Sequence, residues 1–322
     1  MAQPVLTPIT QALEEGALSR RELKDLMRRS NVPGLVHFVV FVCVLGATGA
    51  LINLAMGSVW VVPAMFVHGV VLVHHFALQH ECVHYTAFRT RWLNEVFGNY
   101  CGFVIMLPNR FFRYEHCDHH TYTQLHGRDP ELIELPISAR KYIWYLSSLP
   151  FWFQKFKEIG MHFLGRFSGA EEKFVPREDR GSLVVEARIM ILLYLAVFGA
   201  SAWFNWWGAV WYWWLPLFLG EPVMRAIRMT EHVGRPNVRD MKVNTRTNLV
   251  TLPMRFLCWN MNFHAEHHYA SSVPFHALPK LHRKLRSYVH VERRGYLGAH
   301  FDILSQILGL KPRLGTSSDD RV

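Results

Sequence analysis

Histidines gather in three short windows of this 322-residue chain. The windows read His80-Glu-Cys-Val-His84, His116-Cys-Asp-His119-His120 and His264-Ala-Glu-His267-His268. Residues three and four apart share one face of a helix, so each window directs two or three imidazoles to one side. Neutral imidazole binds zinc, copper, iron and nickel. Because one zinc ion takes at most about four protein ligands, the eight window histidines indicate two metal ions.

The first window also matches the H-E-x-x-H pattern of zinc proteases. An intramembrane zinc protease built on His80, Glu81 and His84 would need one more ligand, for which Asp129 is available. That hypothesis leaves the other six window histidines without a role. Histidines that only form hydrogen bonds at helix ends would explain one window but not three.

Composition predicts a membrane protein with a large polar part. Half of the residues are hydrophobic, and the mean hydropathy is +0.07. The net charge is +10, and the basic residues sit beside apolar runs, which fits a membrane surface better than nucleic acid. The five cysteines form no C-x-x-C pair, which favours reduced thiols over a disulfide framework. The first thirty residues lack the apolar core of a signal peptide.

Four apolar runs have roughly the 20 residues needed to cross a bilayer. They cover about 35–56, 59–79, 183–204 and 207–229. Short turns at Gly57-Ser58 and around Asn205 join them in pairs, and Glu221-Pro222 should kink the last one. Residues 1–34 read as an amphipathic arm, and residues 35–322 as one membrane domain.

The remaining segments predict a helical cap over 80–182 and 230–322. The apolar stretch 93–107 is short for a span and reads as re-entrant or interfacial. Residues 139–167 alternate aromatic and basic side chains, which is typical of one amphipathic helix lying in the membrane interface. The expected fold is therefore all-α: four transmembrane helices under a cytoplasmic helical cap that holds the metal site.

The joint pattern H-x(3)-H, H-x(2)-H-H and H-x(2)-H-H, set between paired spans, resembles the membrane-bound fatty acid desaturase and hydroxylase family over roughly residues 35–290. The resemblance implies two iron ions held by histidine, with O2 as co-substrate. It also implies a further ligand after the fourth span, where His232 stands in Met229-Thr-Glu-His232. The implied ligands are His80, His84, His116, His119, His120, His232, His264, His267 and His268.

The resemblance extends to the approach to the third box, Asn260-Met-Asn262-Phe-His264, where one of the two asparagines would hold a water on iron. The box is followed by Tyr269-Ala-Ser-Ser-Val-Pro274, where many relatives have Leu-Phe-Pro. No cytochrome-b5-like segment is recognisable, so we expect electrons from a separate donor of the ferredoxin, rubredoxin or cytochrome b5 type.

Metal-bound histidines usually need an outer carboxylate or carbonyl to fix the ring. Acids lie within or near every box: Glu81, Glu115, Asp118, Asp129, Glu131, Glu231 and Glu266. We expect Glu81, Asp118, Asp129 and Glu266, with Asn260 and Asn262, to surround the ligands. The other histidines are expected to be buried polar or helix-capping groups (His37, His68, His74, His75) or surface groups (His276, His282, His290, His300).

The expected reaction is O2-dependent desaturation of a fatty acyl or lipid-like chain. Hydroxylation of a lipid or small amphiphile by the same family is the alternative. Both begin with abstraction of hydrogen from an unactivated C–H bond, and they diverge according to the placement of the substrate. Chain length and double-bond position have no signature in the sequence.

Lys and Arg are concentrated in the N-terminal arm, the 79–182 segment and the C-terminal part, and both hairpin turns lack them. The positive-inside rule therefore places these three segments, all three histidine windows and both termini in the cytoplasm. A tag at either terminus should be inaccessible to a protease added to intact cells and accessible after permeabilisation. Cleavage of a C-terminal tag in intact cells would contradict the four-span topology.

Overall fold

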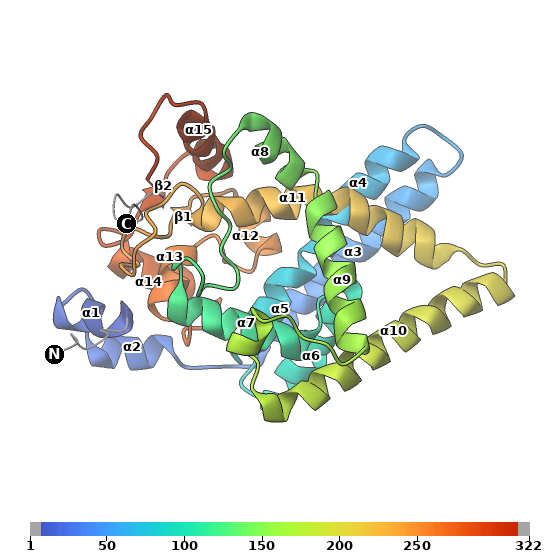
Figure 1. Cartoon of the computed structure of the whole chain (residues 1–322), viewed down its shortest axis with the longest axis horizontal. Helices are drawn as coiled ribbons and strands as arrows, with labels where there is room; N and C mark the ends of the chain where they lie inside the picture. The colour runs from blue at the N-terminus through green and yellow to red at the C-terminus, as the bar shows by residue number, and fades with distance from the viewer. Residues whose placement is uncertain (1–7, 315–322) are drawn as a thin grey trace.

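The computed structural model describes residues 8–314, which form a mostly helical protein with one pair of very short strands (Figure 1). The helices are α1 (Pro8–Glu14), α2 (Arg20–Leu26), α3 (Val32–Ala55), α4 (Val61–Val73), α5 (His75–Val83), α6 (Arg91–Ile105), α7 (Asn109–Tyr122), α8 (Ala139–Leu146), α9 (Leu149–Phe163), α10 (Arg180–Trp203), α11 (Leu215–His232), α12 (Leu252–Leu257), α13 (His264–Tyr269), α14 (Leu278–Leu285) and α15 (Gly295–Ile307). Strands β1 (Thr247–Asn248) and β2 (Val291–Glu292) pair in parallel.

Three helical segments are long and apolar enough to cross a membrane: Val32–Ala55, Val61–Val83 and Arg177–Trp203. They match three of the predicted spans to within a few residues. The first and third are only 17% buried inside the protein, so most of their apolar side chains face outward, as hydrocarbon surroundings require. The second is 56% buried and combines α4 with α5, which carries the first histidine window.

The fourth predicted span does not meet the same measure of length and apolarity in the part of the chain that the structure describes. Its residues form a π-helical turn, Val210–Trp214, followed by α11. Pro222 lies inside this helix, and the kink expected there stays a prediction. Four charged side chains lie along it: Glu221, Arg225, Arg228 and Glu231. The crossing of a membrane by this segment stays a prediction.

Helices α4 and α11 touch through their backbones. A Cβ atom added at Gly69 would lie 1.9 Å from the carbonyl oxygen of Pro216, and one added at Gly220 would lie 2.2 Å from the carbonyl carbon of Gly69. Small residues allow this close approach between membrane helices. The contact fixes α11 against the segment that leads into α5, so that the end of α11 reaches the histidine windows (Figure 1).

The interfacial segments differ in part from expectation. Residues 93–107 lie mainly in α6, which packs against α5. Residues 139–167 form two helices, α8 and α9, instead of the single predicted helix. The break lies at Ser148, whose φ is +60°, and Pro150 explains it, because proline has no N–H to continue the hydrogen bonds of α8.

The described part of the N-terminal arm packs against α14. Ala12 and Leu18 are buried in one cluster with Leu278 and Leu281 of α14, and Lys284 forms an ion pair with Glu22 at 2.5 Å. Residues 1–7 of the predicted arm lie outside the described residues. The arm therefore covers the helices next to the third histidine window.

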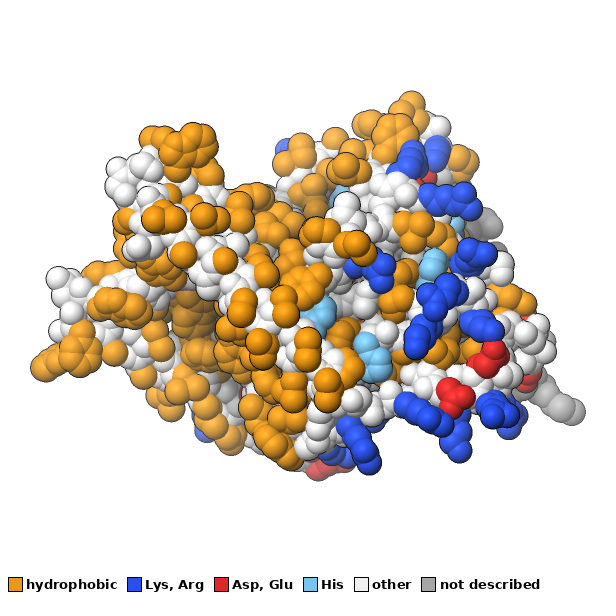
Figure 2. All heavy atoms as spheres, turned by 180° about the vertical axis from the view of Figure 1, so that it is seen from behind, with side chains coloured by type: hydrophobic (Ala, Val, Ile, Leu, Met, Phe, Trp, Pro, Cys, Tyr) orange, Lys and Arg blue, Asp and Glu red, His pale blue; other side chains and the backbone are white. Residues whose placement is uncertain are grey.

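The surface separates apolar from basic side chains. Figure 2 shows apolar side chains over the end of the molecule that carries the α3–α4 and α10–α11 hairpin tips, and Lys and Arg side chains toward the opposite end. Leu54 and Trp203 at the two tips are 81% and 85% exposed. This separation supports association with a membrane.

The backbone contact between α4 and α11 is testable by adding one methyl group. Gly69→Ala and Gly220→Ala should each lower the free energy of unfolding by about 1–3 kcal/mol or more, because a well-packed contact leaves no room for a methyl group. Thermal unfolding of the detergent-purified protein measures the effect. Gly46→Ala in α3, where an added Cβ meets no atom within 4 Å, is the matched control and should leave the melting temperature unchanged.

Candidate metal centre

The predicted ligand histidines come from four helices. His80 lies in the last turn of α5 and His84 directly follows that helix, the second window lies on α7, the third on α13, and His232 is the last residue of α11. The rings of His80, His116 and His267 are at most 1% exposed. Such complete burial of imidazoles is costly unless their nitrogens find partners.

The structure brings all nine histidines together in two groups. The five-histidine group consists of His80, His84, His116, His120 and His267. The four-histidine group consists of His119, His232, His264 and His268. Within each group the candidate ligand nitrogens all lie within 4.8 Å of one another.

The two groups adjoin because two helices serve both. Helix α7 gives His119 to one group and His120 to the other, and α13 divides His267 and His268 in the same way. Consecutive residues on a helix point about 100° apart, so neighbouring histidines reach different sites. The rings of His120 and His268 stack with their centroids 4.2 Å apart, so the two groups are in direct contact.

Hydrogen bonding alone leaves the five-histidine group unsatisfied. The Nε2 atom of His120 lies 3.1 Å from Nε2 of His116 and 3.0 Å from Nε2 of His267. His116 donates its Nδ1–H to Glu131, so its Nε2 carries a lone pair. A single N–H on His120 cannot serve both neighbours. Buried nitrogens without any partner remain on His80 and His84.

The four-histidine group has the same arrangement. Nε2 of His264 lies 2.9 Å from Nε2 of His232 and 3.0 Å from Nε2 of His268. His232 donates its Nδ1–H to the carbonyl of Asn244, and His268 donates its own to Thr123. Their Nε2 lone pairs therefore both face His264. A cation in each group would satisfy these lone pairs, and an all-imidazole donor set suits a first-row transition metal.

The rings are kept neutral, as metal ligands must be. Burial lowers the pKa of His84 to about 3. Burial, together with the neighbouring imidazoles, holds the pKa well below the usual value for His116, His120, His264, His267 and His268. His119 is the exception: burial lowers its pKa, but the Asp129 and Glu131 carboxylates together outweigh burial and raise it.

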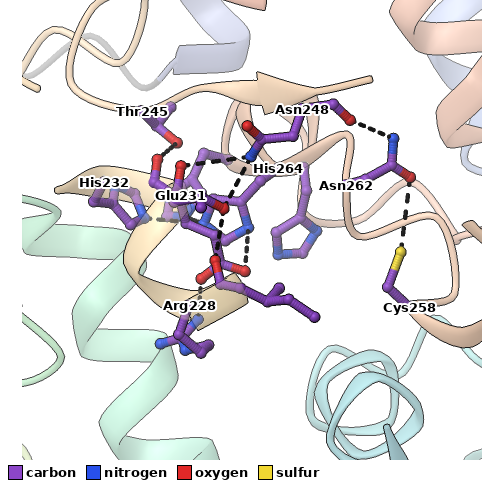
Figure 3. A network of polar contacts seen from close by, with 12 residues as sticks. Arg228, Glu231, His232, Thr245, Asn248, Cys258, Asn262 and His264 are labelled. Carbon is purple, nitrogen blue, oxygen red and sulfur yellow. Dashed lines mark hydrogen bonds and ion pairs between the residues drawn. The ribbon is translucent and has the colours of Figure 1, made fainter. Parts of the chain in front are cut away.

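Three carboxylates lie beside the rings, and two of them orient a ring through a hydrogen bond. Glu131 accepts from Nδ1 of His116 at 2.7 Å, and Asp129 accepts from Nδ1 of His119 at 2.8 Å. Glu231 lies 3.7 Å from Nδ1 of His264. Figure 3 shows Glu231 between Arg228 and His264. Such outer partners fix the tautomer of a ligand histidine and raise its basicity.

Two of the predicted outer residues, Glu81 and Glu266, bind partners other than the window histidines. Glu81 accepts from the Thr86 hydroxyl at 2.7 Å and from the Phe275 N–H at 3.1 Å, and Glu266 accepts from Nδ1 of His282 at 2.5 Å. Within residues 8–314, neither carboxylate is hydrogen-bonded to a window histidine. These two acids join helices and loops, because a residue next to a ligand points to another side of the helix.

The two asparagines also bind away from the groups. Asn260 donates to the carbonyl of Phe275, and Asn262 donates to the carbonyl of Asn248 at 2.9 Å (Figure 3). Asp118 is half-buried, and among the described residues no hydrogen bond joins it to a histidine ring. The place of a water-holding asparagine stays a prediction.

The structure does not bring the residues of the zinc protease hypothesis together in one site. Asp129, which would have been its third ligand, holds His119 in the four-histidine group, whereas His80 and His84 lie in the other group. Glu81, which would have been its base, is fully buried and bound to Thr86 and the Phe275 backbone. The geometry therefore favours a site built from all three windows.

Eight of the remaining ten histidines carried a prediction, and they fall into two sets. His37, His68, His74 and His75 are hydrogen-bonded to backbone carbonyls, as expected. The expectation that His276, His282, His290 and His300 are surface groups is wrong, because all four are half-buried. His282 binds Glu266, and His300 contacts the Tyr142 hydroxyl at 2.8 Å. These partners lie far away in sequence, so local polarity did not reveal them.

Sequence reasoning missed Arg228, Gln124 and Asn244. Arg228 binds both Glu131 and Glu231, and Gln124 donates to the carbonyl of His232 at 2.8 Å. For Arg228 a signal was present: a charged residue inside an apolar helix is a functional candidate by default. Gln124 and Asn244 lie in polar segments with no distinguishing pattern.

Two cavities lie beside the histidines. A narrow one of about 20 Å³ touches both groups through His80 and His264 and is otherwise lined largely by apolar side chains, including Phe76 and Met224. A larger one of about 360 Å³ shares Phe76, Met224 and Arg228 with it. The narrow cavity therefore adjoins both histidine groups, and the larger one, whose lining mixes apolar and charged side chains, adjoins the narrow one.

Comparison with known proteins agrees with this geometry. The family model described as fatty acid desaturase matches residues 66–297. An sn-1 oleoyl-lipid 12-desaturase of Picosynechococcus sp. is 23% identical over 251 residues, which cover 70% of this chain and 68% of that protein. A protein of the same name from Anabaena variabilis is 22% identical over 274 residues, covering 75% of each chain. The chain belongs to the fatty acid desaturase family.

Proposed function

We propose that this protein is a membrane desaturase that uses two histidine-bound irons and O2 to place a double bond in a fatty acyl or lipid-like chain. The observation that supports it most strongly is the pair of adjoining histidine groups, in each of which one central Nε2 faces two neighbouring Nε2 atoms and a single N–H cannot serve both. The relatives named lipid desaturases support the choice of an acyl chain as substrate.

The five-histidine and four-histidine groups would each hold one iron. When bound, the two irons supply the activation of O2 and the oxidising power to remove hydrogen from an unactivated carbon. Glu131 and Asp129 keep the rings of His116 and His119 oriented with their Nε2 lone pairs inward. Desaturation removes two hydrogen atoms, and complete reduction of O2 to water takes two further electrons and two protons. A separate electron-donor protein would provide the electrons.

The narrow cavity marks the place where the reacting part of the chain would come closest to both groups, although its volume of about 20 Å³ would have to increase to admit an alkyl segment. Phe76, Met224 and Met261 line it beside His80 and His264, so an alkyl segment there would be desolvated and held close to both groups. Proximity and orientation of this kind are a major part of catalysis. The larger cavity, which shares Phe76 and Met224 with it, would take the rest of the substrate.

The metal assignment predicts two irons per chain in the detergent-purified protein, with nitrogen-dominated coordination. His232→Ala should lower iron toward one per chain and abolish turnover, because it removes one of four ligands from the four-histidine group. Elemental analysis measures the iron content, and X-ray absorption spectroscopy identifies the coordinating atoms. His126→Ala, whose side chain is 46% exposed, is the matched control. Stoichiometric zinc with little iron in the wild type would contradict the assignment.

The activity predicts a new double bond in the lipids of a host that expresses the protein under O2. Gas chromatography with mass spectrometry of the fatty acids detects it, and a host expressing His267→Ala, which lacks a ligand of the five-histidine group, should show the lipid profile of the empty host. A hydroxylated chain in place of the alkene would establish the alternative reaction of the family. An unchanged profile in the presence of iron, O2 and a supplied electron donor would contradict both.

A further inference from the structure

Arg228 lies between two buried carboxylates. Its Nη1 donates to Glu231 at 2.5 Å, and its Nη2 donates to Glu131. All three side chains are at most 8% exposed. The flat guanidinium also lies over the ring of Phe76 at 5.2 Å. The guanidinium is therefore the shared partner of both carboxylates.

Each of these carboxylates uses its second oxygen for a different histidine group. Glu131 Oε1 accepts from His116 of the five-histidine group at 2.7 Å. Glu231 Oε1 lies 3.7 Å from Nδ1 of His264 in the four-histidine group. The contacts that we name the Arg228 bridge run by hydrogen bonds from His116 through Glu131 and Arg228 to Glu231. Glu231 Oε1 then lies 3.7 Å from His264 without a hydrogen bond to it.

The chemistry of arginine fits this position. The guanidinium presents N–H donors in a rigid planar fork, whereas lysine offers a compact point charge on a flexible stem. One rigid fork fixes the direction of both carboxylates at once. A carboxylate that is fixed in this way fixes the ring whose Nδ1–H it accepts, and removal of such an outer partner typically weakens metal binding by about 10–100-fold.

We propose that Arg228 is a positioning residue that couples the loading of the two histidine groups with metal. A metal bound by one group immobilises its histidine and carboxylate, and through Arg228 it orders the carboxylate of the other group. The second metal then meets a ring that is already ordered and binds more tightly, as expected when one ligand has already met the entropic cost of ordering. This inference rests on the proposed two-metal function of the groups.

The same helix provides a matched control. Arg225 lies one turn earlier on α11 and forms an ion pair with Glu221 at 2.6 Å. It is 13% exposed and its partner 5%, so the pair is nearly as buried as the Arg228 bridge. Within the described residues, no contact joins Arg225 or Glu221 to a window histidine. Loss of Arg225 therefore reports the general effect of breaking a buried ion pair.

The test is the binding of Co²⁺ to the full-length apoprotein in detergent. Equilibrium dialysis and visible absorption measure this binding. The wild type should bind two Co²⁺, the second about tenfold more tightly than the first, within the usual range of coupling between sites. Arg228→Gln should weaken binding at both sites by about 10–100-fold and abolish the coupling. Arg225→Gln should bind like the wild type. Size-exclusion chromatography checks that each variant is folded.

Arg228→Lys serves if Arg228→Gln does not fold, because it keeps a positive charge between the carboxylates. It should bind two Co²⁺ with reduced coupling, since an ammonium cannot hold both carboxylates in one plane. Wild-type coupling in either variant, weakening of one site alone, or an equal effect of Arg225→Gln would overturn the proposal. Failure of the wild type to bind two metal ions would contradict the proposed function instead.

Discussion

Nine imidazoles, seven of them buried and two half-buried, bring their nitrogen lone pairs together, and this is the constraint on which the rest of the structure depends. Without cations, some of these ring nitrogens have no hydrogen-bond partner among the described residues, and burial keeps water from replacing it. Such unpaired polar groups cost folding free energy. His120 and His264 each face two neighbouring Nε2 atoms at about the distance of a single hydrogen bond. The protein must therefore hold these rings in place by other means, and the surrounding carboxylates and helix contacts do so.

The contacts that hold the histidine rings in place come from many parts of the chain. The Gly69–Gly220 backbone contact aligns α11 with the second span, and α11 in turn delivers Arg228, Glu231 and His232 to the groups. The loop after α7 delivers Asp129 and Glu131. Glu81 and Glu266 tie the first and third windows to Phe275 and His282. The site is thus the meeting point of several helices, each fixed by at least one polar contact.

The sequence was sufficient to predict those features that depend on residues close together in the chain. Helical periodicity within each window predicts which rings share a face, and apolar runs of span length predict α3, the α4–α5 segment and α10. Contacts between distant segments were not predictable in this way. Arg228 and Glu131 lie 97 residues apart, and His282 meets Glu266 only because α14 folds back beside α13. Likewise, the division of nine histidines into groups of five and four depends on how α7 and α13 cross the other helices.

The neighbouring pairs His119-His120 and His267-His268 also limit how this chain can change in length. Deleting or inserting one residue within α7 turns every following side chain by about 100° around the helix axis. The ring that served one group would then face the other, or neither. Loops between the histidine helices can gain or lose residues at small cost, since loop entropy varies slowly with length; the loop after α7 is the exception, because it carries Asp129 and Glu131. Tolerance to insertions and deletions should therefore fall sharply at the helix boundaries and be lowest between His116 and His120 and between His264 and His268.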